Sequence, residues 1–88
     1  MELKLIKYGA DWCHMCKQLE TELSKETITI PHESIDVETL EDEELDSLNI
    51  RNLPVLILLK KVGDTWETIH RWNGFIKATV INDYIKGL

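Results

Sequence analysis

The pattern of apolar and polar positions along the chain predicts four strands and three helices. The strands are predicted over residues 3–8, 34–38, 53–59 and 66–72, where apolar residues alternate with polar ones or form a short continuous run. The helices are predicted over about residues 12–25, 40–48 and 76–88, where apolar residues recur at every third or fourth position. Turns are expected at Gly9, around Gly63 and at Gly74.

Three details of this pattern lead to finer expectations. The alternation in residues 27–31 ends at a proline, so this segment fits either a strand of the sheet or a connection. Thr39 is expected to cap the acidic helix, with Asp42 as its capping-box partner. Trp66 and Trp72 are an even number of residues apart, so we expect them to pack on the same face of the last strand.

The element order β-α-β-α-β-β-α predicts the α/β class. Alternating strands and helices followed by a hairpin make a four-stranded mixed sheet, flanked by three helices that cover both faces. A chain of 88 residues fits one domain, which we expect to span residues 1–88 and to be a monomer.

The chain is acidic, with 16 Asp and Glu against 10 Lys and Arg and a net charge of −6. This balance argues against nucleic acid as a partner, because binding to phosphates needs clustered Lys and Arg. Six of the acids lie close together in the sequence, at Glu38, Glu41, Asp42, Glu43, Glu44 and Asp46. They fit either a solvated helix face or a docking patch for a basic partner.

The hydropathy of the chain predicts no membrane association. No segment approaches the roughly 20 apolar residues that a membrane span needs. The N-terminal residues also lack the apolar run of a signal peptide. We therefore expect a cytoplasmic location.

The two cysteines, Cys13 and Cys16, form a C-x-x-C motif. In a reducing compartment, paired cysteines are more often catalytic or metal-binding than structural. A structural zinc site needs four ligands, and His14, His32 and His70 lack the spacing that would complete one, so we expect no metal. A structural disulfide is also weak here, because closing so short a loop removes little entropy from the unfolded chain. Redox chemistry is therefore the leading interpretation.

The position of the motif, after a strand and at the start of a helix, suits thiol chemistry. Cys13 falls at or just before the first helical turn, where unpaired N–H groups and the helix dipole lower the pKa of a thiol. Cys16 follows one turn later, roughly beneath Cys13 and within reach of its sulfur. The spacing predicts an exposed nucleophile at Cys13 and a protected resolving thiol at Cys16. Trp12 is expected to form an apolar shoulder beside Cys13, to pack in the core, or both.

Taken together, these residues resemble the thioredoxin family. The resemblance rests on Trp12-Cys13-His14-Met15-Cys16 after a strand, on Leu53-Pro54 opening a buried strand and on Gly74 before the last helix. Residues 35–38 and 50–54 also follow the family pattern, and the likeness covers about residues 2–88. It implies a minimal thioredoxin fold and a thiol–disulfide oxidoreductase that reduces protein disulfides by dithiol exchange. No bound cofactor is implied beyond the redox-active Cys13–Cys16 disulfide.

The resemblance also implies roles for residues around the cysteines. Pro54 is expected to be cis and to face the cysteines, unless it is an ordinary trans proline at the start of a strand. The backbone of Leu53 is expected to pair with the substrate chain as an added strand. Gly74 is expected to border the same groove, unless it is simply a turn glycine.

The chain departs from the family in its N-terminal region and between the cysteines. It lacks the additional N-terminal strand and helix of full-length thioredoxins. The pair His14-Met15 matches neither the thioredoxin nor the glutaredoxin motif. His14 either stabilises the thiolate, which would make the protein more oxidising, or points to solvent.

Lys7 is another departure, because thioredoxins have a buried Asp at this position, six residues before the first cysteine. A cation here favours thiolates. A buried lysine is also able to accept the Cys16 proton. We expect instead that Lys7 extends to water along the strand edge.

The expected partners are a disulfide-containing substrate protein and an electron donor, either a thioredoxin-reductase-like flavoprotein or glutathione. Two other functions stay open. One is a glutathione-dependent glutaredoxin, although the usual Cys-Pro-Tyr-Cys motif and recognisable glutathione-binding residues are missing. The other is a non-catalytic binding subunit with the thioredoxin fold, against which the intact motif and Leu53-Pro54 argue.

Overall fold

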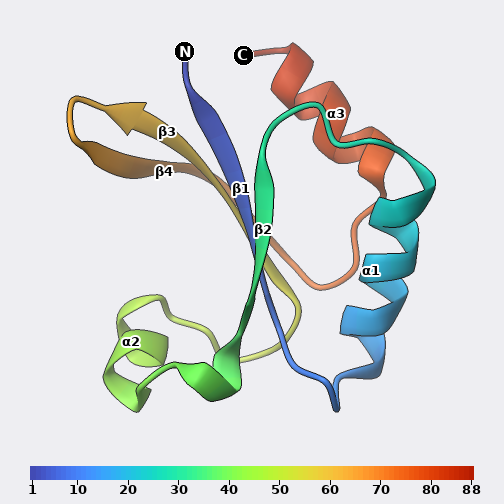
Figure 1. The fold of residues 1–88 in the computed structure, drawn as a ribbon, viewed down its shortest axis with the longest axis vertical. Helices are drawn as coiled ribbons and strands as arrows, with labels where there is room; N and C mark the ends of the chain where they lie inside the picture. The colour runs from blue at the N-terminus through green and yellow to red at the C-terminus, as the bar shows by residue number, and fades with distance from the viewer.

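The computed structural model describes residues 1–88 and contains one mixed sheet with three α-helices (Figure 1). The strands are β1 (Leu3–Gly9), β2 (His32–Asp36), β3 (Val55–Val62) and β4 (Thr65–Asn73). The helices are α1 (His14–Lys25), α2 (Asp42–Ser47) and α3 (Ala78–Lys86), with a short 3-10 helix, η1 (Val37–Thr39), before α2. The α/β class and the element order are therefore as predicted. None of the helices combines the length and the apolar character needed to cross a bilayer.

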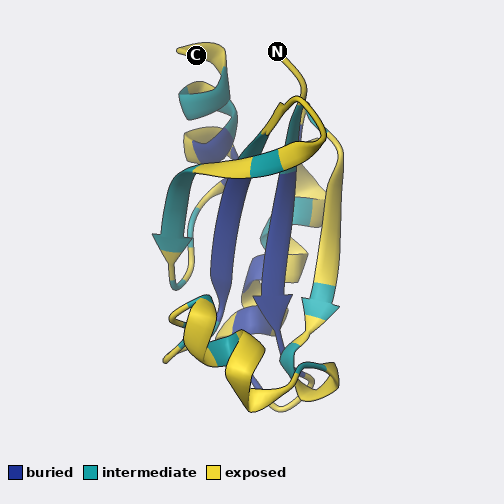
Figure 2. Ribbon diagram, turned by 90° about the vertical axis from the view of Figure 1, so that its left-hand side faces the viewer, coloured by how far each residue is buried: buried dark blue, intermediate teal, exposed yellow.

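The strands lie in the order β2-β1-β3-β4. β1 runs parallel to β2 and antiparallel to β3, and β3 pairs antiparallel with β4. The two central strands are the most buried part of the sheet, whereas β2 is largely exposed (Figure 2). The apolar run predicted as the third strand is thus a central strand, although it begins at Val55 and extends to Val62.

The helices cover the two faces of the sheet unequally. α1 and α3 lie against one face, where Leu19 and Ile81 are fully buried with Leu56 of β3 (Figure 1). Each such buried aliphatic side chain stabilises the fold by about 1.5–3 kcal/mol relative to exposure. α2 lies at one end of the other face, where Leu48 packs against the cluster that contains Tyr8 (Figure 2).

The strand register brings three loops to one end of the sheet. Tyr8 of β1 pairs with Val55 of β3, and Val55 in turn pairs with Asn73 of β4. Because both pairings are antiparallel, the segment after β1, the segment before β3 and the segment after β4 meet at this end. These three segments contain the C-x-x-C motif, Leu53-Pro54 and Gly74.

The acidic helix is shorter than predicted and has a different cap. α2 begins after Glu41, whose backbone N–H donates to the side chain of Glu44 at 3.3 Å. The expected pairing of Thr39 with Asp42 is wrong. Thr39 ends η1, and its hydroxyl donates to the carbonyl oxygen of Asp36 at 2.7 Å. Thr39 therefore belongs to η1, and its hydroxyl is not available to cap α2.

A bulge in the β3–β4 pairing overturns the expectation that Trp66 and Trp72 share a face. The register of the two strands shifts once along their length. Trp72 lies opposite Leu56 and packs on the face covered by α1 and α3. Trp66 lies opposite Lys61, five residues further along β3 and therefore on the other face. There the ammonium of Lys4 sits 4.4 Å from the Trp66 ring centroid.

Residues 27–31 form a connection between α1 and β2 rather than a strand. Ile28 is nevertheless buried in the core beneath α1 and α3. The carbonyl oxygen of Pro31 accepts a hydrogen bond from the N–H of Leu5 at 3.0 Å, which leads the chain into the sheet. β2 accordingly begins at His32, two residues earlier than predicted.

Candidate active site

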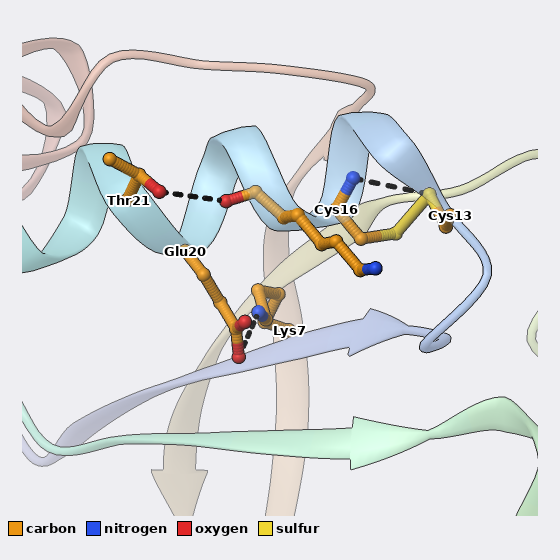
Figure 3. A network of polar contacts seen from close by, with 6 residues as sticks. Lys7, Cys13, Cys16, Glu20 and Thr21 are labelled. Atoms are coloured by element: carbon orange, nitrogen blue, oxygen red, sulfur yellow. Dashed lines mark hydrogen bonds and ion pairs between the residues drawn. A yellow bond between two sulfur atoms is a disulfide. The ribbon is translucent and has the colours of Figure 1, made fainter.

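Cys13 and Cys16 form a disulfide at the start of α1 (Figure 3). Their Cα atoms are 5.2 Å apart. Cys13 is the N-cap of α1, and its Sγ accepts a hydrogen bond from the backbone N–H of Cys16 at 3.1 Å. The predicted position of Cys13 at the first helical turn is therefore confirmed. A sulfur so placed meets the positive end of the helix dipole, which stabilises a thiolate.

Both cysteines are largely buried. Cys13 is 8% exposed and Cys16 is 4% exposed, so the predicted contrast between an exposed and a protected cysteine is small in this disulfide form. Ala10, Val37 and Leu53 pack around the pair and account for the burial. The two cysteines differ instead in the surface hollow that each one lines.

Cys13 lines a groove with mainly apolar walls. The apolar residues that line it with Cys13 include Trp12, Leu45 of α2, Ile50 and Leu53. Trp12 is 69% exposed, so it forms a shoulder of the groove and does not pack in the core. Its indole Nε1 donates to a carboxylate oxygen of Glu38 at 2.6 Å, which holds the ring in place.

Leu53, Pro54 and Gly74 meet beside the cysteines. The Leu53–Pro54 peptide bond is cis, as the family resemblance implied, and Leu53 packs against the cysteine cluster. The N–H of Gly74 donates to the carbonyl oxygen of Pro54 at 2.8 Å. Gly74 has a φ of 91°, and a Cβ there would lie 3.9 Å from Sδ of Met15. Gly74 is thus both a turn glycine and a neighbour of the motif.

Cys16 lines a different, more polar hollow, which Lys7 and Glu20 share. Nζ of Lys7 lies 3.1 Å from Oε1 of Glu20, and the Lys7 side chain is 8% exposed (Figure 3). The expectation that Lys7 extends to water along the strand edge is therefore wrong. Its side chain rises from β1 toward α1, where Glu20 pairs with it and offsets the cost of burying the charge.

Glu20 is not among the residues predicted for the site, although the sequence contains a signal for it. Glu20 follows Cys16 by four residues, which places the two side chains on the same face of a helix. A lysine in an apolar strand also needs an acidic partner if it is buried. The two patterns point to the Lys7–Glu20 pair only once Lys7 is known to be buried, which the structure shows.

The inner residues of the motif lie on the surface. His14, the first residue of α1, is exposed, and the hydrogen bond that Cys13 Sγ accepts comes from the backbone of Cys16. The structure therefore gives His14 no hydrogen bond to either sulfur. Met15 is 45% exposed and extends beside Gly74.

The remaining histidines do not gather around the cysteines. The His70 ring stacks on Tyr84 at 4.4 Å between ring centroids and meets the edge of Trp72 at 4.5 Å. His32 is exposed at the start of β2. No group of three or more His, Cys, Asp or Glu side chains is arranged to hold a metal ion.

The family model described as Thioredoxin matches residues 1–87. The chain belongs to the thioredoxin family. No curated protein matches it by sequence.

Solved structures of thioredoxins share the fold of this family member. Thioredoxin-2 of the malaria parasite, described as a component of its protein secretion machinery, has a TM-score of 0.82 at 22% identity. That match covers 99% of this chain and 84% of the parasite chain. The Trichomonas vaginalis thioredoxin has a TM-score of 0.78 at 24% identity, covering 98% of this chain and 79% of that one. A mutant thioredoxin from Halobacterium salinarum has a TM-score of 0.77 at 24% identity, with 98% and 74% covered.

These findings establish the minimal thioredoxin fold, in which four strands and three helices carry the C-x-x-C disulfide. The family and the disulfide together indicate thiol–disulfide exchange as the chemistry of the site.

Proposed function

We propose that this thioredoxin-family protein reduces disulfides in other proteins by dithiol exchange through Cys13 and Cys16. The observation that carries the proposal is the position of Cys13, which caps α1 and lines an apolar groove next to cis-Pro54. The cap favours the thiolate that attacks a disulfide, and the groove offers contact area to a substrate chain.

The reaction starts from the reduced pair. The Cys13 thiolate attacks one sulfur of the substrate disulfide, so that a Cys13–substrate disulfide forms and the other substrate sulfur leaves as a thiolate. Cys16 then loses its proton and attacks Sγ of Cys13. The Cys13–Cys16 disulfide forms and the second substrate sulfur leaves. Two electrons have then passed to the substrate, and the protein is in the form seen in the structure.

Residues around the groove are assigned to substrate binding. The backbone of Leu53 precedes β3 and is available to pair with an extended substrate segment. Trp12 presents an exposed apolar face beside Cys13, and Gly74 lies next to Met15 of the motif. We propose that Trp12, Leu53, Pro54 and Gly74 together hold the substrate disulfide against Cys13.

The oxidised pair must be reduced before the next turnover. We propose a thioredoxin-reductase-like flavoprotein or glutathione as the donor, acting on a monomeric single domain in the cytoplasm, where thiols are kept reduced. The reduction potential of the pair distinguishes the two donors. A value of about −270 mV supports a flavoprotein reductase. A value above about −200 mV supports a glutathione-coupled or oxidising protein and makes His14 the next residue to replace.

Turnover of a disulfide protein tests the proposed function. We expect catalytic amounts of the wild-type protein to accelerate the reduction of insulin by dithiothreitol. Cys13→Ser should lower the rate to that without protein, because the remaining thiol, Cys16, is buried and does not line the groove. Thr21→Ser, an equally small change on the exposed side of α1, should retain the wild-type rate. No acceleration by the wild type, or full acceleration by Cys13→Ser, would rule the proposal out.

A further inference from the structure

Two charged residues, Lys7 of β1 and Glu20 of α1, lie near Cys16 on the elements that surround its sulfur. Cys16 and Glu20 are four residues apart on α1, and Gly9 and Lys7 are two residues apart on β1. Each pair therefore lies on one face of its element. Sγ of Cys16 lies over Gly9, where a Cβ would be 3.2 Å from it. Glu20 lies over Lys7, with 3.1 Å between Oε1 and Nζ (Figure 3).

Lys7 is the only charged residue in the buried part of the molecule. Its side chain is 8% exposed, whereas that of Glu20 is 65% exposed. The ammonium is therefore held in a region of low polarity, with the carboxylate reaching in from the solvent side. A charge in such surroundings acts more strongly on its neighbours than a charge in water does.

The other charged groups around this position are exposed. Asp11, Lys17 and Asp36 also line the hollow that contains Cys16, and His32 lines the adjoining one beside Lys7. All four are solvent-exposed, so water and salt screen their fields. The buried charge near Cys16 is consequently that of Lys7, and Glu20 is the exposed acid that contacts it directly, with 3.1 Å between Oε1 and Nζ.

We propose that Lys7 stabilises the thiolate of Cys16 during resolution of the mixed disulfide and that Glu20 is the positioning residue that holds the Lys7 ammonium there. The proposal rests on the resolving role given to Cys16 above. It assigns to a lysine–glutamate pair the control of the second thiol, while the helix N-terminus controls the first.

The proton balance of this step is simple. The Cys16 thiol releases its proton to water in the hollow, and Lys7 remains an ammonium ion throughout. The thiolate attacks Sγ of Cys13, the Cys13–Cys16 bond forms, and the electron pair of the broken mixed disulfide leaves on the substrate sulfur. Once the disulfide has formed, Cys16 carries no charge and Glu20 alone balances Lys7, as in the structure.

Titration of the Cys16 thiol in a Cys13→Ser background tests the proposal directly. The ultraviolet absorbance of the thiolate is followed against pH, so no substrate or turnover is needed. Lys7→Met removes the cation and should raise the pH midpoint of thiolate formation by about one unit or more. Glu20→Gln removes the opposing carboxylate but keeps an oxygen for Lys7 to contact, so it should lower the midpoint.

The opposite signs distinguish electrostatics from loosened packing, since a merely structural effect would move both variants in the same direction. Lys4→Met is the matched control, because Lys4 lies on the same strand but faces the other side of the sheet. The midpoint of Cys16 thiolate formation in this control should equal that of the Cys13→Ser protein. Unchanged midpoints in both Lys7→Met and Glu20→Gln, or shifts of the same sign, would overturn the proposal. Glu20 is exposed, so Glu20→Gln is informative even if Lys7→Met fails to fold.

The titration tests the roles of Lys7 and Glu20, and the insulin assay tests the proposed function, so a negative result in one does not decide the other. A protein that shows the two opposite shifts but no turnover would retain the electrostatic assignment and lose the proposed function. A protein that reduces insulin but shows unshifted midpoints in the variants would retain the proposed function and lose the electrostatic assignment.

Discussion

Single side chains around the disulfide act differently on its two sulfurs. Trp12 and Leu53 surround Cys13 with apolar area, whereas Lys7 and Glu20 place charges near Cys16. A nucleophile that must receive a protein chain benefits from apolar contact. A thiol that must lose a proton benefits from a nearby cation. The surroundings of each cysteine therefore match the step assigned to it.

Tyr8 shows the same influence of surroundings on a group outside the site. Burial raises the pKa of the Tyr8 phenol above its ordinary value of 10.0, and the negative charges of Glu33 and Glu44 raise it further. The folded protein thus keeps this proton to a higher pH than the unfolded chain does. The resulting contribution to stability is complete below about pH 10 and is lost as the pH rises through the folded-state pKa.

Replacing Tyr8 should make the protein less sensitive to alkali. We expect Tyr8→Phe to reduce the alkaline fall in unfolding free energy, by about 1.4 kcal/mol for each pH unit between the unfolded and folded pKa values. Urea unfolding at neutral pH and above pH 10 measures the fall. Tyr84→Phe is the control and should follow the wild type. An equally steep fall in Tyr8→Phe would contradict the assignment.

Among the elements, the contact between β4 and α2 supports one wall of the groove. The guanidinium of Arg71 donates to the carbonyl oxygens of Leu48, the C-cap of α2, and of Asn49. A cation at this end satisfies carbonyls that lack partners within the helix. Because α2 supplies Leu45 to the groove, Arg71 helps to fix the part of the groove wall that α2 forms.

Loss of this contact should destabilise the fold measurably. We expect Arg71→Met to lower the unfolding free energy by about 1.5–3 kcal/mol, the usual contribution of hydrogen bonds from a charged donor. Arg51→Met is the control. Arg51 and Asp46 are 3.5 Å apart with side chains 68% and 72% exposed, so its loss should cost less than about 1 kcal/mol. Equal decreases in unfolding free energy for the two variants, measured by urea unfolding, would show that the Arg71 contacts with Leu48 and Asn49 do not stabilise the fold.

The elements that could be predicted from the sequence are those with a strong apolar period. The central strand and both longer helices follow directly from their patterns. The cap of α2 could not be predicted, because Thr39 and Glu41 both suit the start of a helix and only the preceding turn decides between them. The bulge that separates Trp66 from Trp72 has no local signal either, since it belongs to the pairing of two strands.

For the whole molecule, the site depends on contacts that a single segment does not encode. The motif, Leu53-Pro54 and Gly74 could be predicted from the resemblance, and the register explains why they meet. The burial of Lys7 could not, because it depends on α1 packing over β1. The burial of both cysteines likewise depends on packing by Val37 and Leu53, which come from other segments of the chain.

The net charge of −6 also acts at the scale of the molecule. The acidic side chains of α2 and the side chain of Glu38 are exposed beside the groove. They keep this part of the surface solvated and repel acidic chains that approach it.

The most direct test of the account is capture of the mixed disulfide with a disulfide protein such as insulin. Reduced Cys16→Ser and Cys13→Ser variants are mixed with it, acid-quenched and analysed by non-reducing mass spectrometry. The account predicts that Cys16→Ser accumulates a covalent complex through Cys13, because the resolving thiol is absent, and that Cys13→Ser accumulates little or none. Equal capture by the two variants, or capture chiefly through Cys16, would contradict the division of roles.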